Sequence, residues 1–288
     1  MRIEEIVENA AVEMMRRAAT SLPPDVMTAL KNAYKNEMAD AGKTQLGAIL
    51  ENIELGGGKI PLCQDTGVML FYATVGKGFG DASFLHSTLT KAVRRATDEV
   101  PLRPNAVHPL TRKNSNDNTG VNMPHVTWDV GDGDRLELTL MSKGAGSENM
   151  SAFAMLSPSG GATAVKKFVI DHVINAGAQP CPPTIIGVGI GGSADISMKL
   201  AKKALLRPIG QHHAEADIAK LEEELLKGIN MTGIGPMGLG GTNTALGVNA
   251  EYAYCHTACF PVAINTQCWA ARRSTSRIGR NGDIEVVV

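Results

Sequence analysis

Four glycine-rich segments interrupt the apolar stretches of this chain and restrict the elements that it can form. They lie at residues 56–58, 144–146, 187–192 and 233–241. Because glycine weakens the interior of a helix or strand, such runs are typical of turns and of close backbone approaches. Glycine accounts for 31 of 288 residues, which is about 11% against an average near 7%. Tight turns are therefore expected to define much of the fold.

Segments with helical and strand-like patterns alternate between these turns. Apolar residues three and four positions apart predict three helices in the first 55 residues, the second beginning at Pro23-Pro24 and the third covering 44–55. Further helices are expected over 81–100, 162–175, 194–206 and 214–226. Strands are expected over 68–75, 125–130, 135–141, 184–188, 245–254 and 260–264.

The strands at 125–130 and 135–141 give the clearest hairpin pattern, because both alternate apolar with polar residues and Gly131-Asp-Gly-Asp134 joins them. Other strands are linked by helices, so the sheet should contain both parallel and antiparallel pairs. No repeat, low-complexity linker or charge block marks a domain boundary. We therefore expect one domain over 1–288, of the α/β (α+β mixed) class, with a mixed parallel/antiparallel sheet surrounded by helices.

Composition and charge exclude several classes of protein. The chain is 43% hydrophobic, yet no stretch approaches the roughly 20 apolar residues of a membrane span. Its N-terminus is charged and does not resemble a signal peptide, so a cytoplasmic, soluble protein is expected. A formal net charge of −1 and only 4% aromatic residues argue against a nucleic-acid partner.

Three of the five cysteines share an unusual context. Cys63, Cys181 and Cys268 each lie in a loop marked by glycine or proline next to a predicted strand, and none lies on an obvious apolar face. This placement favours metal ligands over packing residues, although unrelated free thiols would give the same pattern. The long spacings exclude a zinc ribbon, a redox Cys-x-x-Cys pair and a ferredoxin run.

The other two cysteines, Cys255 and Cys259, flank His256 in Tyr254-Cys-His-Thr-Ala-Cys259. Their spacing of four residues is compatible with a metal site. The more ordinary interpretation is that both cysteines are small residues in a packed segment. His256 would then be a core histidine whose hydrogen bonds are satisfied.

Two glycine patterns match a dinucleotide-binding motif, at Gly187-x-Gly189-x-x-Gly192 and Gly233-x-Gly235-x-x-Gly238. The acidic residue expected about 20 positions later has no good candidate after the first of them. In a glycine-rich chain such matches arise easily by chance. Backbone N–H groups in such loops also bind simple anions, which would suit a carboxylate ligand.

Two polar residues in loops are candidates for chemistry. Asp65 could act as a general acid or base, or only as a turn residue. Arg103 lies near the start of a long polar loop over 101–124 and could bind a carboxylate through its guanidinium fork, or simply lie on the surface.

Seven separated motifs, in order along nearly the whole chain, resemble the alpha subunit of the two-subunit, class I iron–sulfur fumarate hydratases. They are Cys63-Gln-Asp-Thr-Gly67, Leu102-Arg-Pro-Asn105, Gly144-Ala-Gly-Ser-Glu-Asn149, Cys181-Pro-Pro183 with Gly187-Val-Gly-Ile190, Arg207-Pro-Ile-Gly210, Gly233-Ile-Gly-Pro236 and Gln267-Cys-Trp-Ala270. The same family contains the L-tartrate dehydratase alpha subunits. Within it, Gly146-Ser-Glu-Asn149 resembles the fumarate hydratase form.

The resemblance implies a 4Fe-4S cluster held by Cys63, Cys181 and Cys268, with one iron left open to act as a Lewis acid. Cys255 and Cys259 are then not ligands. It also implies that Gln64, Asp65, Arg103 and Gly146 contact a dicarboxylate substrate, Arg103 through its fork and Gly146 through its backbone N–H. Asp65 and His256 correspond to the acid pair of the family.

The activity implied is the interconversion of L-malate with fumarate and water. L-tartrate dehydratase and a non-catalytic dicarboxylate or iron–sulfur binding protein are the alternatives. A separate fumarate hydratase beta subunit would supply the opposing base, so the chain alone should have little activity. An α2β2 assembly with an alpha–alpha contact is the form that the family implies.

Overall fold

The computed structural model describes residues 2–287, and these divide into two compact units. Unit 1 contains the residues up to Pro23, Ile53–Gly144 and the segment from Arg272 onward; unit 2 contains Pro24–Asn52 and Ala145–Ala271. The expectation of one domain over 1–288 stays a prediction, because contacts within a chain do not measure which parts fold independently.

Unit 1 is built on a five-stranded mixed sheet in the order β2-β1-β3-β8-β9. Strand β2 pairs with β1 in parallel, and the remaining pairs are antiparallel. Two helices, α1 (Ile3–Thr20) and α4 (Leu85–Glu99), pack on this sheet. The strands are β1 (Val68–Gly76), β2 (His125–Gly131), β3 (Arg135–Lys143), β8 (Arg273–Gly279) and β9 (Ile284–Val286).

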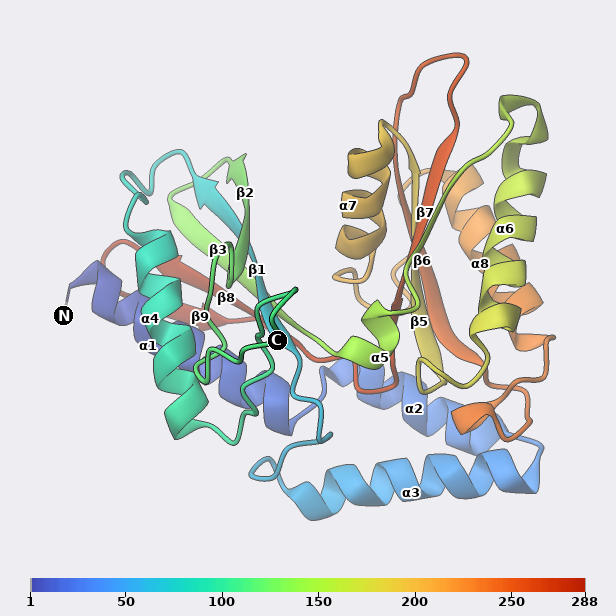
Figure 1. The fold of residues 1–288 in the computed structure, drawn as a ribbon, viewed down its shortest axis with the longest axis horizontal. Helices are drawn as coiled ribbons and strands as arrows, with labels where there is room; N and C mark the ends of the chain where they lie inside the picture. The colour runs from blue at the N-terminus through green and yellow to red at the C-terminus, as the bar shows by residue number, and fades with distance from the viewer. Residues whose placement is uncertain (1, 288) are drawn as a thin grey trace. The chain divides into compact units, whose positions relative to one another are not determined.

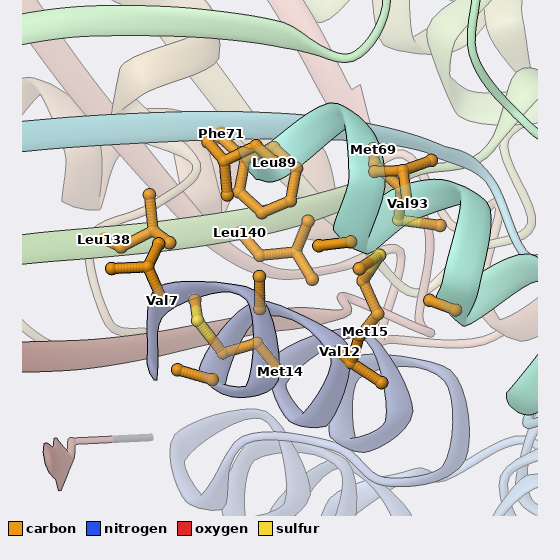
Figure 2. Packing of buried hydrophobic residues seen from close by; sticks show 14 of the residues in the cluster. Val7, Val12, Met14, Met15, Met69, Phe71, Leu89, Val93, Leu138 and Leu140 are labelled. Atoms are coloured by element: carbon orange, nitrogen blue, oxygen red, sulfur yellow. The ribbon is translucent and has the colours of Figure 1, made fainter. Parts of the chain in front are cut away.

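The core of unit 1 lies between α1, α4 and one face of this sheet. Phe71 of β1 and Leu138 and Leu140 of β3 contribute side chains from the sheet, and Met14 of α1 and Leu89 of α4 meet them from the helices (Figure 2). All five are essentially buried. The alternation of β1 and the helical spacing of α1 and α4 therefore each point one apolar face into the same core.

The predicted hairpin between 125–130 and 135–141 is wrong, although both strands exist. Strand β1 lies between β2 and β3 and pairs with each of them. The reason is burial: β1 is apolar and largely buried, whereas β2 is mostly exposed and takes the sheet edge. The residues of the turn do not indicate which strand will occupy the centre of the sheet.

Unit 2 is built on a four-stranded mixed sheet in the order β4-β7-β5-β6, with β5 and β6 parallel and the other pairs antiparallel. Helix α7 lies on one face of this sheet, and α6 and α8 lie on the other (Figure 1). The strands are β4 (Ala152–Met155), β5 (Thr184–Gly191), β6 (Ala245–Ala253) and β7 (Pro261–Gln267). The helices are α2 (Pro24–Asn36), α5 (Ala145–Glu148), α6 (Gly161–Ala176), α7 (Ala194–Ala204) and α8 (Ala216–Asn230), with two 3₁₀ turns at Pro158–Gly160 and Pro236–Gly238. Helix α3 (Asp40–Gly56) contains the boundary at residues 52 and 53.

The first dinucleotide-like glycine pattern lies largely inside strand β5. A Cβ added to Gly187 would lie 2.1 Å from the carbonyl oxygen of Ala201, and one added to Gly189 would lie 1.9 Å from that of Ser197. Both oxygens belong to α7. Only glycine lets this helix pack directly on the strand, so close helix–strand packing explains the spacing without a nucleotide.

A buried carboxylate fixes the start of α3 and the 242–243 loop of unit 2. Glu37 is 3% exposed and accepts hydrogen bonds from the backbone N–H groups of Met38, Ala39, Thr242 and Asn243. Its Oε2 also accepts one from the Asn243 side chain at 2.8 Å. Burial alone would raise the pKa of Glu37, but the bonds from Asn243, Thr242 and Ala39 outweigh it and lower this pKa to about 2.

Replacing Glu37 with glutamine is expected to destabilise the chain in a pH-dependent way. Because the folded-state pKa of Glu37 lies below the 4.5 of a free glutamate side chain, the ionised carboxylate stabilises the fold above pH 4.5, by about 3 kcal/mol for such a shift. This contribution disappears as the pH falls through about 2. Unfolding free energies of the wild type and E37Q should differ at pH 7 and converge only as the pH falls to about 2. E51Q, at an exposed position of α3, is the control; equal stability of E37Q and wild type at pH 7 would contradict the assignment.

The predicted α/β class is confirmed, but the chain forms two mixed sheets where one was expected. Most helices and strands were predicted within a few residues. Helix α4 begins at Leu85 and not at Asp81, because Asp81 accepts a hydrogen bond from the Ser83 N–H in a local turn. The prediction missed α5, β4, β8 and β9. Among the described residues, every helix is too short or too polar to cross a bilayer.

Candidate active site

In unit 1, the loop from Cys63 to Gly67 connects α3 to β1 and is held against the segment Arg103–Asn105. The Arg103 N–H donates to the Thr66 hydroxyl at 3.0 Å, and the Asn105 side chain donates to the Gly67 carbonyl at 3.1 Å. Three predicted site residues, Gln64, Asp65 and Arg103, are thereby brought together. The side chains of Gln64 and Arg103 are exposed, as binding of a ligand requires.

Gly67 fixes this loop against the end of β3. Its φ is +79°, and an added Cβ would lie 2.8–2.9 Å from backbone atoms of Lys143. A side chain would therefore be strained in conformation and would also clash with backbone. This contact places the loop beside Gly144, the residue that follows β3.

The Asp65 carboxylate, which is partly buried, is held within its own loop. Its Oδ1 accepts a hydrogen bond from the Gly67 N–H at 2.9 Å, and its Oδ2 lies 3.1 Å from the position that a Cβ on Gly144 would take. The turn role that the sequence allowed for Asp65 is therefore real. It leaves the carboxyl group fixed in direction, which a general acid or base also needs.

In unit 2, two of the predicted cysteine ligands lie side by side. The Trp269 N–H, one residue after Cys268, donates to the Cys181 carbonyl at 3.3 Å. Both cysteine side chains are partly exposed. Cys181 has a φ of +55°, a conformation that is uncommon for a residue with a side chain and that concentrates at functional sites.

Gly146 lies in the short helix α5, next to the Cys181 loop. An added Cβ would lie 3.4 Å from the carbonyl oxygen of Gln179, two residues before Cys181. The other end of α5 is fixed by Glu148, which pairs with Lys202 of α7 and accepts a hydrogen bond from the Asn265 side chain of β7 at 3.2 Å. No sequence pattern indicated a role for Glu148 or Asn265; only the motif Gly146-Ser-Glu-Asn149 marked this segment.

His256 does not lie with the cysteines of unit 2. Strand β5 begins three residues after Cys181 and runs parallel to β6, which ends three residues before His256. Cys268 follows directly after β7, whose other end begins near His256. The histidine and both cysteines are thus at opposite ends of one sheet, roughly 20 Å apart for strands of this length. His256 is exposed on the β6–β7 connection together with Cys255 and Cys259.

The donor set fits an iron–sulfur cluster in its chemistry. None of the five cysteines, all within the described residues, forms a disulfide, and those predicted as ligands lie in loops and are partly accessible. Cys63 belongs to unit 1, and Cys181 and Cys268 belong to unit 2. Within residues 2–287 no group of three His, Cys, Asp or Glu side chains forms a site for a single metal ion. Thiolates from separate loops are the ligands that such clusters use.

An aspartate fixed in direction and an exposed arginine are residue types that a lyase acting on a carboxylate can use. Comparison with known proteins shows the family of the chain. The family model of fumarate hydratase (Fumerase) matches residues 8–277. The chain is 50% identical over 283 residues to the putative L(+)-tartrate dehydratase subunit alpha of Methanocaldococcus jannaschii, covering 96% of this chain and 98% of that protein. It is 38% identical over 279 residues to the L(+)-tartrate dehydratase subunit alpha of Escherichia coli strain UTI89, covering 96% and 91%. The chain belongs to the fumarate hydratase family of hydro-lyases.

Proposed function

We propose that this chain is the cluster-binding alpha subunit of a hydro-lyase that interconverts L-malate with fumarate and water. The observation that carries the proposal is the Asp65 carboxylate, which the Gly67 N–H fixes two residues from Cys63, in a loop that Thr66 holds against the segment of Arg103. It unites a proton donor, a carboxylate-binding cation and a thiolate ligand on one loop system, in a chain of hydro-lyase ancestry.

Cys63, Cys181 and Cys268 would hold a 4Fe-4S cluster. When bound, such a cluster supplies an open iron that acts as a Lewis acid on a hydroxyl or carboxylate. Cys255 and Cys259 lie on the β6–β7 connection with His256 and take no part in this ligand set.

The remaining groups bind the dianion and move a proton. Arg103 would form a forked hydrogen bond to one carboxylate, Gln64 would donate to it, and the Gly146 N–H would bind the other end. Asp65 would protonate the departing hydroxyl of malate, and in the reverse direction it would take that proton from water. A base must also remove the C3 proton.

A beta subunit is the proposed source of that base. The relatives described above are named as alpha subunits, which implies a second kind of chain in those proteins. We therefore place this chain in a hetero-oligomer in the cytoplasm, with the beta subunit completing the dicarboxylate site.

The acid pair of Asp65 and His256 would then require two copies of the chain. Within unit 2, His256 is at the opposite end of the sheet from Cys181 and Cys268, so a cluster bound to these two cysteines would lie away from the His256 of the same chain. An exposed His256 from a second copy can meet this need. An alpha–alpha contact in an α2β2 assembly is thus part of the proposal.

L(+)-tartrate dehydration is the second candidate, because it is the activity in the names of the relatives. Tartrate carries one hydroxyl more than malate. The motif Gly146-Ser-Glu-Asn149, which resembles the fumarate hydratase form, is the reason for placing malate first.

Anaerobic reconstitution with iron, sulfide and the partner beta subunit, followed by assays on malate, fumarate and both tartrate enantiomers, tests the proposal. We expect reversible malate–fumarate turnover by the complex and little turnover by the alpha chain alone. Turnover of tartrate only would select the second candidate. A reconstituted complex that acts on none of these substrates would refute the hydro-lyase assignment.

A further inference from the structure

Arg272 is one of the most completely buried side chains of the chain, at 1% exposure, and lies four residues after Cys268. A buried guanidinium is costly unless its donors and its charge are satisfied. Its Nε is nevertheless buried without a hydrogen-bond partner among the described residues. Burial of a charged side chain with one donor unsatisfied needs an explanation beyond packing.

The contacts of Arg272 within unit 1 are with the Asp65 loop. Its Nη1 donates to the backbone carbonyl of Asp65. Its Nη2 lies 3.2 Å from the position of a Cβ on Gly144, the same point that Asp65 Oδ2 approaches to 3.1 Å. The guanidinium therefore holds the main chain of Asp65 and lies with the carboxylate on one side of Gly144.

The backbone of Arg272 is itself fixed to the end of strand β3. The Ser142 N–H donates to the Arg272 carbonyl at 3.1 Å, and the next residue, Arg273, pairs with Met141 in the sheet. Gly67 holds the other side of the loop against Lys143. The Asp65 loop is thus held on one side by Arg272 and on the other by Gly67, and both of these residues contact the C-terminal end of β3.

We propose that Arg272 is a positioning residue that sets the direction of the Asp65 carboxyl group. The inference rests on the proposed function for the role of Asp65 in proton transfer, but the clamp itself is independent of it. Arginine suits the task because its planar fork presents several donors in fixed geometry, whereas lysine offers a single point charge on a flexible stem.

Arg280 provides a matched control in the same unit. Its Nη1 also donates to a backbone carbonyl, that of Phe79, at 3.0 Å. This hydrogen bond involves none of the proposed site residues. R280K therefore reports what the loss of an arginine–carbonyl clamp does to unit 1 in general.

Hydrogen exchange of the full-length chain, with R272K and R280K compared to wild type, tests the clamp without any assay of activity. We expect exchange in a peptide covering 61–68 to become at least about tenfold faster in R272K, as loss of a hydrogen bond of about 1.4 kcal/mol would produce. Exchange in α4 should stay unchanged, and R280K should leave 61–68 unchanged. Unaltered exchange at 61–68 in R272K, or equal loosening throughout unit 1, would refute the proposal.

Kinetics of the reconstituted alpha–beta complex test the consequence for catalysis. In R272K, kcat should fall about 100-fold with KM nearly unchanged, because a small displacement of a proton donor costs rate more than binding. A rise in KM with kcat preserved would show weaker substrate binding and would contradict a positioning role for Arg272. If the wild-type complex acts on no substrate, the proposed function fails, while the exchange experiment still decides whether Arg272 clamps the loop.

Discussion

Serine in place of Cys181 should leave the reconstituted protein without its iron–sulfur cluster and lower turnover by on the order of 1,000-fold or more. The serine hydroxyl is a poor ligand for iron, and the Lewis acid that would be lost supplies several kcal/mol of transition-state stabilisation. Cys63→Ser and Cys268→Ser should have the same effect. Iron and sulfide per chain, together with absorbance near 400 nm after anaerobic reconstitution, measure the result.

Cys255→Ser and Cys259→Ser are the matched controls for this experiment. Both thiols are exposed on the β6–β7 connection, at the end of the unit 2 sheet away from Cys181 and Cys268. These variants should retain full iron content. Retention of the cluster absorbance near 400 nm in all three variants of Cys63, Cys181 and Cys268, or its loss in the two controls, would show that the ligand set is wrong.

Asp65→Asn is expected to lower turnover by about 100- to 10,000-fold, the range for removal of a general acid or base, while the cluster is retained. Asparagine keeps an oxygen that can accept the hydrogen bond from the Gly67 N–H, so the turn should survive. Malate and fumarate turnover by the alpha–beta complex, with iron content measured in parallel, separates the loss of a proton donor from loss of the cluster.

Asp81→Asn is the control for Asp65. Asp81 accepts a hydrogen bond from the Ser83 N–H at 2.9 Å in a similar turn of unit 1, and no site residue contacts it in that turn. D81N should have wild-type turnover. If D65N also kept wild-type turnover, Asp65 would have no catalytic role and another group would have to be the proton donor.

Local sequence was sufficient for most helices but not for strand pairing. The spacing in α1 and the proline before α2 encode those helices directly, because each depends on residues within a few positions. Strand β2 was located correctly, yet its partner was not, because pairing depends on which strand is apolar enough to take the centre of the sheet. Strands β4 and β9, of four and three residues, are too short for a clear pattern, and β8 is built mostly of polar residues and so lacks an apolar alternation.

The candidate site shows the same division. Motif resemblance supplied Cys63, Asp65 and Arg103 as candidates, and unit 1 brings the loops of these residues together. Resemblance could not indicate Asn105 or Arg272 as supports of that loop, because each acts through a hydrogen bond to a segment at least 38 residues away.

By itself, the sequence indicated the family and the order of most elements and provided a set of candidate site residues, since side-chain type and local spacing are written directly in it. Only the tertiary structure decided that the glycines of β5 serve helix packing, that β1 separates β2 from β3, that His256 lies at the far end of the sheet from Cys181 and Cys268, and that Asp65 is clamped by Arg272. Each of these depends on which distant segments compete for the same buried space, and no local pattern records that competition.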